Sequence, residues 1–331
     1  MANEHKRQTI LVTGCAGFIG ARISELLLER GDTVIGVDNL NEAYPPLLKE
    51  WRLARLQRLP AFKFEGRDIT HFDALKELFQ QYHFDAVMNL AARAGVRASV
   101  EDPYVYLETN VTGTLNLLEL CKAFGVKKFL LSSTSSLYGA SEMPFREDKR
   151  TDFQLSPYAA SKKGAESLAY TYHYLHGIDI TIPRYFTVYG PAGRPDMSIF
   201  KFIHHIAEGL PIPVYGDGTQ ERDFTYIDDI ARGSIAAIKP LGFEVINLGS
   251  DRPVKLNHVI RLIEQYLGKK AQIEFHPRHL ADVLATWADI TKAKALLGWQ
   301  PLVSIEEGIQ KTVAWYLENR EWVKNIGNFE H

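Results

Sequence analysis

Tyr158 and Lys162 place a phenol and an ammonium group four residues apart. Residues at that spacing share one face of a helix, so the two side chains can lie together. A free tyrosine has a pKa of about 10, and a nearby positive charge lowers it, which makes the hydroxyl a usable base near neutral pH. The spacing alone is a weak indication, because such pairs also arise by chance.

Five hydroxyl side chains precede this pair, in the run from Ser132 to Ser136 that directly follows the apolar residues 129–131. Buried hydroxyl groups are costly unless they are hydrogen-bonded. The hydroxyls of a sugar would supply the missing partners. We therefore expect this cluster to form one site with Tyr158 and Lys162.

A glycine-rich loop, Gly14-Cys-Ala-Gly17-Phe-Ile-Gly20, lies between the first predicted strand and the first predicted helix. Glycines let the backbone turn tightly and approach a pyrophosphate, and a helix N-terminus adds free N–H groups with partial positive charge. The strand–loop–helix context favours dinucleotide binding over a plain structural turn. The positive nicotinamide ring of such a dinucleotide would further lower the pKa of Tyr158.

Asp38 ends the second predicted strand. A carboxylate at that point can accept hydrogen bonds from a ribose 2′-hydroxyl and would repel a 2′-phosphate. This favours NAD over NADP. The alternative is an aspartate that caps a helix or a turn.

The first half of the chain predicts the sheet that must position these residues. Apolar runs at 9–13, 33–38, 62–67, 86–90, 128–132 and 178–184 alternate with helical patterns at 21–30, 72–81, 109–124 and 158–176. This alternation is typical of a parallel sheet with helices on both faces. Prolines break this alternation after Arg184, where we expect a loop-rich region with a helix at 198–208. A helix at 226–238 and a strand at 244–248 should then return to the sheet. After Asp251 we expect two or three helices and little else.

The predicted fold class is therefore α/β, a Rossmann-type doubly wound parallel sheet with a smaller, mostly helical substrate lobe over the carboxyl ends of its strands. We expect the NAD-binding domain to span 1–184, with 228–250 returning to it. A substrate-binding lobe would comprise 185–227 and 251–331.

Composition excludes several classes of protein. The 331 residues carry a net charge of -2, without the basic excess of a nucleic-acid binder. No run approaches the roughly 18 apolar residues of a membrane span. Two cysteines and the absence of an apolar leader lead us to expect a cytoplasmic protein without a disulfide framework. We expect His173 and His176 to lie on the surface or to pack locally rather than to bind a metal as a pair. We expect the basic run 49–58 to form a solvated helix face.

Together these features resemble the extended short-chain dehydrogenase/reductase superfamily, the NAD-dependent epimerases and dehydratases, over nearly the whole chain. Within it the sequence is most similar to the UDP-glucuronate 4-epimerases. The stretches that carry this resemblance are Asp38-Asn-Leu-Asn, Ala91-Ala-Arg-Ala-Gly-Val-Arg97, Arg184-Tyr-Phe-Thr-Val-Tyr-Gly-Pro191, Gly193-Arg-Pro-Asp-Met197 and Arg222-Asp-Phe-Thr-Tyr-Ile-Asp228.

The resemblance implies a tightly held and reused NAD, Tyr158 as base, Lys162 as its electrostatic and ribose-binding partner, and Thr134 as the hydroxyl that orients the sugar 4-OH. The implied cofactor-binding residues are Gly14, Gly17, Phe18, Ile19, Gly20, Asp38, Asn39, Asp68, Ile69, Leu90, Ala91, Ala92, Asn110, Ser132, Tyr158, Lys162 and Phe186. The implied substrate-binding residues are Arg97, Thr134, Ser135, Ser136, Thr187, Arg194, Val214, Tyr215, Arg222, Arg278 and Asp282. The last two stand in Arg278-His-Leu-Ala-Asp282, which has alanine where relatives have glycine.

Relatives share the removal of the 4-OH proton with hydride loss from C4, and differ in the later steps of the reaction. Dehydratases keep an acid/base carboxyl pair where this chain has Ser135 and Ser136, and the decarboxylases that make UDP-xylose carry a glutamate in place of Ser136. Hydroxyls of very high pKa cannot replace carboxyls. We therefore expect 4-epimerisation of UDP-glucuronate to UDP-galacturonate, with a UDP-glucose/UDP-galactose 4-epimerase as the alternative and a decarboxylase behind it. A catalytically silent NAD(H)-binding member is the alternative outside the enzymes.

A glucuronate oxidised at C4 is a β-keto acid, which loses CO₂ readily. We expect Ser135, Ser136, Thr187 and Arg194 to hold its carboxylate away from that geometry, because arginine can grip a carboxylate through two parallel hydrogen bonds. No metal, nucleic acid or membrane partner is expected. Family analogy implies a homodimer paired through the helices at 103–124 and 157–176, and a role in polysaccharide biosynthesis.

Overall fold

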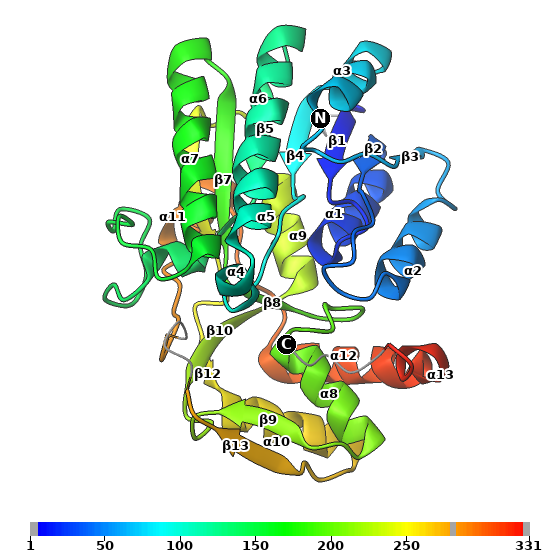
Figure 1. Ribbon diagram of the computed structural model, residues 1–331, viewed down its shortest axis with the longest axis vertical. Helices are drawn as coiled ribbons and strands as arrows, with labels where there is room; N and C mark the ends of the chain where they lie inside the picture. The colour runs from blue at the N-terminus through cyan, green and yellow to red at the C-terminus, as the bar shows by residue number, and fades with distance from the viewer. Residues whose placement is uncertain (1–5, 279–282, 327–331) are drawn as a thin grey trace.

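A mostly parallel sheet forms the larger part of the molecule (Figure 1). The computed structural model describes residues 6–278 and 283–326. Its large sheet has the strand order β11-β7-β5-β4-β1-β2-β3, with β6 beside β7, and every pair is parallel. The strands are β1 (Thr9–Thr13), β2 (Thr33–Val37), β3 (Phe62–Glu65), β4 (Ala86–Asn89), β5 (Lys128–Leu131), β6 (Ser133–Thr134), β7 (Asp179–Tyr185) and β11 (Phe243–Leu248).

Helices cover both faces of this sheet, because its central strands are apolar on both sides. Leu11 packs in the core formed with α3 (Phe72–Gln81), α6 (Gly113–Phe124) and α7 (Pro157–His176). Its neighbour Ile10 packs in the opposite core, with α1 (Phe18–Glu29), α2 (Leu47–Leu56) and α9 (Ile227–Ala236). Successive residues of a strand point to opposite faces, so one apolar run serves both layers. The doubly wound α/β prediction is confirmed.

A smaller lobe lies below the carboxyl ends of the strands in Figure 1. Its own core is rich in aromatic and isoleucine side chains. Its elements are β8 (Thr187–Tyr189), α8 (Ser198–Glu208), β9 (Ile212–Tyr215), β10 (Glu221–Tyr226), β12 (Pro253–Lys255), α10 (Leu256–Leu267), β13 (Ile273–His276), α12 (Ile305–Glu318) and α13 (Arg320–Val323). The order β12-β10-β8 makes a three-stranded sheet, and β9 pairs with β13.

The remaining elements are short: α4 (Ala98–Glu101), α5 (Pro103–Leu107), the π-helical η1 (Glu108–Thr112), the 3₁₀ turn η2 (Ser135–Tyr138) and α11 (Thr291–Leu297). The helix predicted at 109–124 is thus a π-helical turn followed by α6. The prediction of two or three helices and little else after Asp251 is wrong, because the described residues there form four helices and two strands. β13 escaped detection because all four of its residues are exposed, so no apolar alternation marks it.

The sequence-based domain boundaries stay a prediction. β11 pairs with β7 in the large sheet, and α9 packs against α1. α11 packs against β11 and α9, a contact between the predicted lobe and the sheet that those boundaries do not include. Among the residues that the structure describes, no helix combines the length and apolarity needed to cross a membrane.

Candidate functional site

A cavity of about 510 Å³ lies where the sheet meets the smaller lobe. Ligands of open α/β sheets bind at this edge, outside the carboxyl ends of the strands. The cavity has the size of a ligand site and is lined from both parts of the molecule. Of the residues named from the sequence, the lining includes Gly14, Gly17, Phe18, Ile19, Gly20, Asp38, Asn39, Asp68, Ile69, Leu90, Ala91, Ala92, Ser132, Thr134, Ser135, Ser136, Tyr158, Lys162, Phe186, Thr187, Arg194 and Arg222.

The glycine loop forms a backbone cradle at one end of this cavity. Gly14 has a φ of +69° and donates its N–H to Val37 O at 2.7 Å. A Cβ on Gly20 would lie 2.1 Å from the Gly14 carbonyl oxygen, so only glycine fits there. α1 begins directly after Gly17 without a side-chain cap, which leaves its first N–H groups for a ligand. The pyrophosphate of a dinucleotide fits a cradle of this kind.

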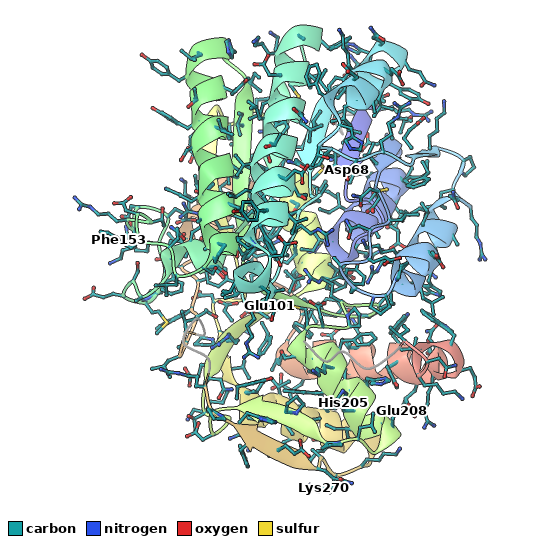
Figure 2. All side chains as sticks on the ribbon, in the orientation of Figure 1. Asp68, Glu101, Phe153, His205, Glu208 and Lys270 are labelled. Carbon is teal, nitrogen blue, oxygen red and sulfur yellow. The ribbon has the colours of Figure 1, made fainter. Side chains whose placement is uncertain are left out.

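Asp38 is 7% exposed and lies beside this cradle. Its Oδ2 accepts the Ala16 N–H at 3.1 Å, and its Oδ1 accepts the Leu40 N–H at 2.8 Å. Asp68, in the loop after β3 (Figure 2), accepts a hydrogen bond from Asn39 Nδ2 at 2.6 Å. Burial alone would raise the pKa of Asp68, but hydrogen bonds from neighbouring side chains and backbone hold it below its ordinary value. Asp68 thus remains a charged acceptor, and both carboxylates lie at the ribose end predicted for NAD.

Tyr158 and Lys162 both line the cavity, from the first turns of α7. The Thr134 side chain faces the Tyr158 hydroxyl. Burial raises the pKa of Tyr158, whereas Thr134 and Arg194 lower it. The sequence predicts that Lys162 lowers this pKa, but Lys162 is not among the groups that do so. Lys162 Nζ donates to Ser132 O at 2.9 Å, and burial lowers the pKa of Lys162 to about 8. Burial thus shifts the pKa of both side chains away from the ordinary value, which marks them as candidates for acid/base chemistry.

A buried ion pair lies one helical turn beyond Lys162. Glu166 accepts from Arg184 Nε at 2.9 Å and Nη2 at 2.7 Å, and from Ser133 Oγ at 2.6 Å. The Glu166 charge raises the pKa of Lys162 against the effect of burial. A bidentate arginine–carboxylate pair fixes both partners, so this pair anchors α7 to β6 and β7 beneath the site.

Hydroxyl groups and Arg194 surround the rest of the cavity. Thr134 Oγ1 accepts the Ser136 N–H at 3.1 Å and donates to Ser136 Oγ at 3.1 Å, so these groups order one another. Arg194 Nε and Nη2 donate to Asp196 at 3.0 and 2.6 Å, and Nη2 also donates to Ala94 O. The sugar end thus combines several hydroxyls with one guanidinium group.

Some residues implied by the resemblance lie away from the cavity walls. The Asn110 amide is engaged by the Arg93 backbone and by Ser161 Oγ, so it fixes the backbone after β4 against α7. Arg97 packs over the Tyr215 ring at 3.9 Å, and Val214 is fully buried in the lobe core. Arg278 is exposed, and its predicted partner Asp282, with His279, lies outside the described residues.

The prediction of a solvated helix face for the basic run 49–58 is correct for the exposed Arg55 and Arg58 and wrong for Lys49 and Arg52. Lys49 and Arg52 are only 5% and 4% exposed, and Lys49 lines the cavity. The sequence carried the signal, since both residues fall on the same helix stripe as the buried Leu48, Leu53 and Leu56. Other cavity-lining residues that sequence reasoning missed include Asn41, Tyr44, Phe145, Met197 and Thr286.

The two histidines at the end of α7 have local partners. The Nδ1 atom of His173 is 2.8 Å from Ile178 O, and the His176 ring contacts Tyr172. Across residues 6–278 and 283–326, no three or more His, Cys, Asp or Glu side chains gather as a metal site.

Comparisons with known proteins agree with this geometry. Residues 10–249 match the family model "NAD dependent epimerase/dehydratase family". The chain is 61% identical, over 96% of its length and 98% of the relative's, to a UDP-glucuronate 4-epimerase from Thermodesulfobacterium geofontis (strain OPF15).

Two solved structures share the fold. A UDP-glucuronic acid 4-epimerase from Bacillus cereus, in complex with UDP-glucuronic acid and NAD, superimposes with a TM-score of 0.89 at 39% identity, covering 94% of this chain and 99% of that one. A UDP-glucose 4-epimerase from Thermotoga maritima, with UDP-glucose, gives a TM-score of 0.86 at 33% identity with the same coverage. The chain therefore belongs to the NAD dependent epimerase/dehydratase family, among the UDP-glucuronate 4-epimerases.

Proposed function

We propose that this protein is an NAD-dependent isomerase that interconverts UDP-glucuronate and UDP-galacturonate at C4. One observation carries the proposal: Tyr158, whose pKa burial raises and Thr134 and Arg194 lower, lines one cavity together with the dinucleotide cradle and Arg194. The relative at 61% identity and the superimposed structure at 39% identity are named UDP-glucuronate and UDP-glucuronic acid 4-epimerase.

The chain's own residues supply the acid/base chemistry. Tyr158 takes the proton of the sugar 4-OH, and Thr134 orients that hydroxyl. Arg194 lowers the pKa of the phenol against the effect of burial, and Lys162, charged below its pKa of about 8, would bind the ribose of the dinucleotide. A bound NAD would supply the hydride acceptor and donor for C4. Gly14, Gly20 and Asp38 would hold the dinucleotide.

Epimerisation needs no acid or base beyond this pair. The 4-keto sugar turns within the cavity, takes the hydride on its other face and recovers the proton from Tyr158. Ser135 and Ser136 stand beside Thr134 and carry hydroxyls, which cannot serve as the acid and base of water elimination. Arg222 lines the cavity and donates to Leu284 O at 3.2 Å, a position from which its guanidinium would contact the diphosphate.

The residues at the sugar end of the cavity favour a uronate, which carries a carboxylate, over a neutral hexose. Arg194 lies at the sugar end of the cavity with Ser135, Ser136 and Thr187. An arginine in a water-poor cavity recognises a carboxylate through charge-assisted hydrogen bonds. We infer that this set holds the carboxylate and suppresses loss of CO₂ from the oxidised sugar.

We also propose a cytoplasmic homodimer that serves polysaccharide biosynthesis. The two cysteines, Cys15 and Cys121, are free and buried, which suits a reducing compartment. Exposed apolar side chains on α5 and α7 support pairing through those helices; they include Tyr104, Leu107, Tyr170 and Tyr174. Analytical ultracentrifugation that returns a monomer at micromolar concentration would exclude the dimer.

The proposed function is tested by incubating the purified protein with UDP-glucuronate without added NAD, followed by NMR and mass spectrometry. A product of unchanged mass with the UDP-galacturonate spectrum supports the proposal and indicates that NAD co-purifies. A product that has lost CO₂ would assign the protein to the decarboxylases. Turnover of UDP-glucose alone would make it a neutral-sugar epimerase and remove the role given to Arg194.

A further inference from the structure

The strap, as we name residues 39–46 between β2 and α2, borders the cofactor end of the cavity. Asn41 Nδ2 donates to Asn39 Oδ1 at 2.7 Å, and Lys49 Nζ donates to Asn41 O at 2.6 Å. Asn39 in turn donates to Asp68. The strap is therefore tied both to α2 and to the loop after β3, and it places Tyr44 on the cavity wall.

Three cations surround the ring of Tyr44, which is 9% exposed. Lys49 Nζ lies 5.0 Å from the ring centroid, and the Cζ atoms of Arg194 and Arg52 lie at 5.6 and 5.8 Å. A cation within about 6 Å of an aromatic face is attracted by the ring, most strongly where water is excluded. Burial and the repulsion of these arginines lower the pKa of Lys49 to about 8, although Asp38 opposes them. One ring thus gathers charges that repel one another.

Hydrogen bonds to Asp196 and Ala94 hold the Arg194 side chain, and Arg52 holds the backbone just before it. Asp196 accepts from two of its nitrogens, and Ala94 O accepts from one of these. Arg52 Nη2 donates to Ala192 O at 2.6 Å and to Gly193 O at 3.3 Å, the two carbonyls that precede Arg194. Arg52 also donates to the Tyr44 hydroxyl at 2.9 Å. Tyr44 therefore contacts both Arg194 and the residue that holds its backbone.

We propose that Tyr44 is a positioning residue for Arg194. Its ring couples the strap that borders the dinucleotide site to the arginine that faces the sugar carboxylate. This inference rests on the function proposed above, in which Arg194 orients the uronate. Without the ring, Arg194 holds the carboxylate less firmly, and part of the 4-keto sugar decarboxylates. In that step the C5–C6 bond breaks, its electron pair moves into an enolate of the C4 ketone, CO₂ leaves, and C5 takes a proton from water.

Two substitutions separate the ring from the hydroxyl. Tyr44→Leu removes the ring. We expect the KM for UDP-glucuronate to rise about tenfold, with kcat within about twofold of the parent. We also expect a second, decarboxylated product. Tyr44→Phe keeps the ring and should restore the parental KM and the single product. Tyr82→Leu is the matched control, because Lys63 packs over that ring at 5.2 Å outside the cavity.

Hydrogen–deuterium exchange of the holoenzyme gives a readout that does not depend on turnover. We expect faster exchange at residues 192–197 in Tyr44→Leu than in the parent, Tyr44→Phe or Tyr82→Leu. Parental exchange and a parental KM in Tyr44→Leu would overturn the proposal. If the parent does not turn over UDP-glucuronate, the proposed function fails, and the exchange result alone decides the role of Tyr44. Tyr44→Met, which fills the space without a ring, replaces Tyr44→Leu if that variant does not fold.

Discussion

We expect Lys162 to be needed for catalysis although its buried charge destabilises the fold, so Lys162→Met should lower turnover and raise stability. Burial lowers the pKa of Lys162 from 10.5 to about 8. Each pKa unit corresponds to 1.36 kcal/mol, so the buried charge destabilises the fold by about 3 kcal/mol at neutral pH. The variant loses the hydrogen bond to Ser132 O, which is worth about 1 kcal/mol. We therefore expect Lys162→Met to be more stable by about 2 kcal/mol at pH 7, while its turnover falls by roughly 100-fold.

The sign of this effect depends on pH. The unfolded chain keeps the lysine proton up to about pH 10.5, whereas the folded protein releases it near pH 8. Between these values unfolding takes up a proton, so the stability of the parent rises with pH. The advantage of Lys162→Met is therefore full below pH 8 and fades towards pH 10.

The assay is thermal unfolding of both proteins, freed of bound nucleotide, at pH 7 and at pH 10. A gain of about 2 kcal/mol corresponds to an increase in Tm of roughly 4 °C at pH 7. Lys127→Met, at an exposed lysine just before β5, is the control and should move the Tm by less than about 1 °C at either pH. A Lys162→Met protein that is less stable than the parent at pH 7, or equally stabilised at both pH values, would show that the buried ammonium charge does not destabilise the fold.

Three further predictions concern single groups. Tyr158→Phe should reduce turnover at least 1,000-fold by NMR while NAD stays bound, because only the proton acceptor is lost; a variant with a tenth of the parental rate would exclude Tyr158 as the base. Gly20→Ala should lower the NAD content of the purified protein at least tenfold, since the new Cβ would lie 2.1 Å from Gly14 O, whereas Gly66→Ala, with its nearest neighbour at 3.7 Å, should keep NAD. The hydrogen bonds from Arg320 hold the pKa of Glu208 (Figure 2) near 2. Glu208→Gln should therefore lower the Tm at pH 7, and this decrease in Tm should disappear as the pH falls from about 4.5 to 2. An equal decrease in Tm at about pH 2.5 would contradict the pairing of Glu208 with Arg320.

The parts of the site that depend on local backbone were predictable from the sequence. The glycine loop is such a case, because a strand, a tight turn at Gly14 and a helix start are all encoded within a few residues. Tyr158 and Lys162 are another, because helical spacing alone brings them to one face. Their shared place beside Thr134 follows from the order of strands in a doubly wound sheet.

The parts that depend on packing between distant segments were not predictable. Arg52 is buried because carbonyl oxygens of residues 192 and 193, far along the chain, accept its hydrogen bonds. Tyr44 reaches Arg194 only because the strap and the loop after β8 meet at the cavity. The Asn110 amide turns to the Arg93 backbone and Ser161 instead of the cavity, a choice between partners that the sequence pattern leaves open.

Transient oxidation at C4 is best tested by the fate of the hydrogen on that carbon. UDP-glucuronate carrying deuterium at C4 is incubated with the holoenzyme in ordinary water, and the UDP-galacturonate formed is examined by NMR and mass spectrometry. We expect deuterium to remain at C4, because the hydride removed from one face returns to the other. Loss of the deuterium to solvent would contradict transient oxidation at C4 and, with it, the role assigned to Tyr158.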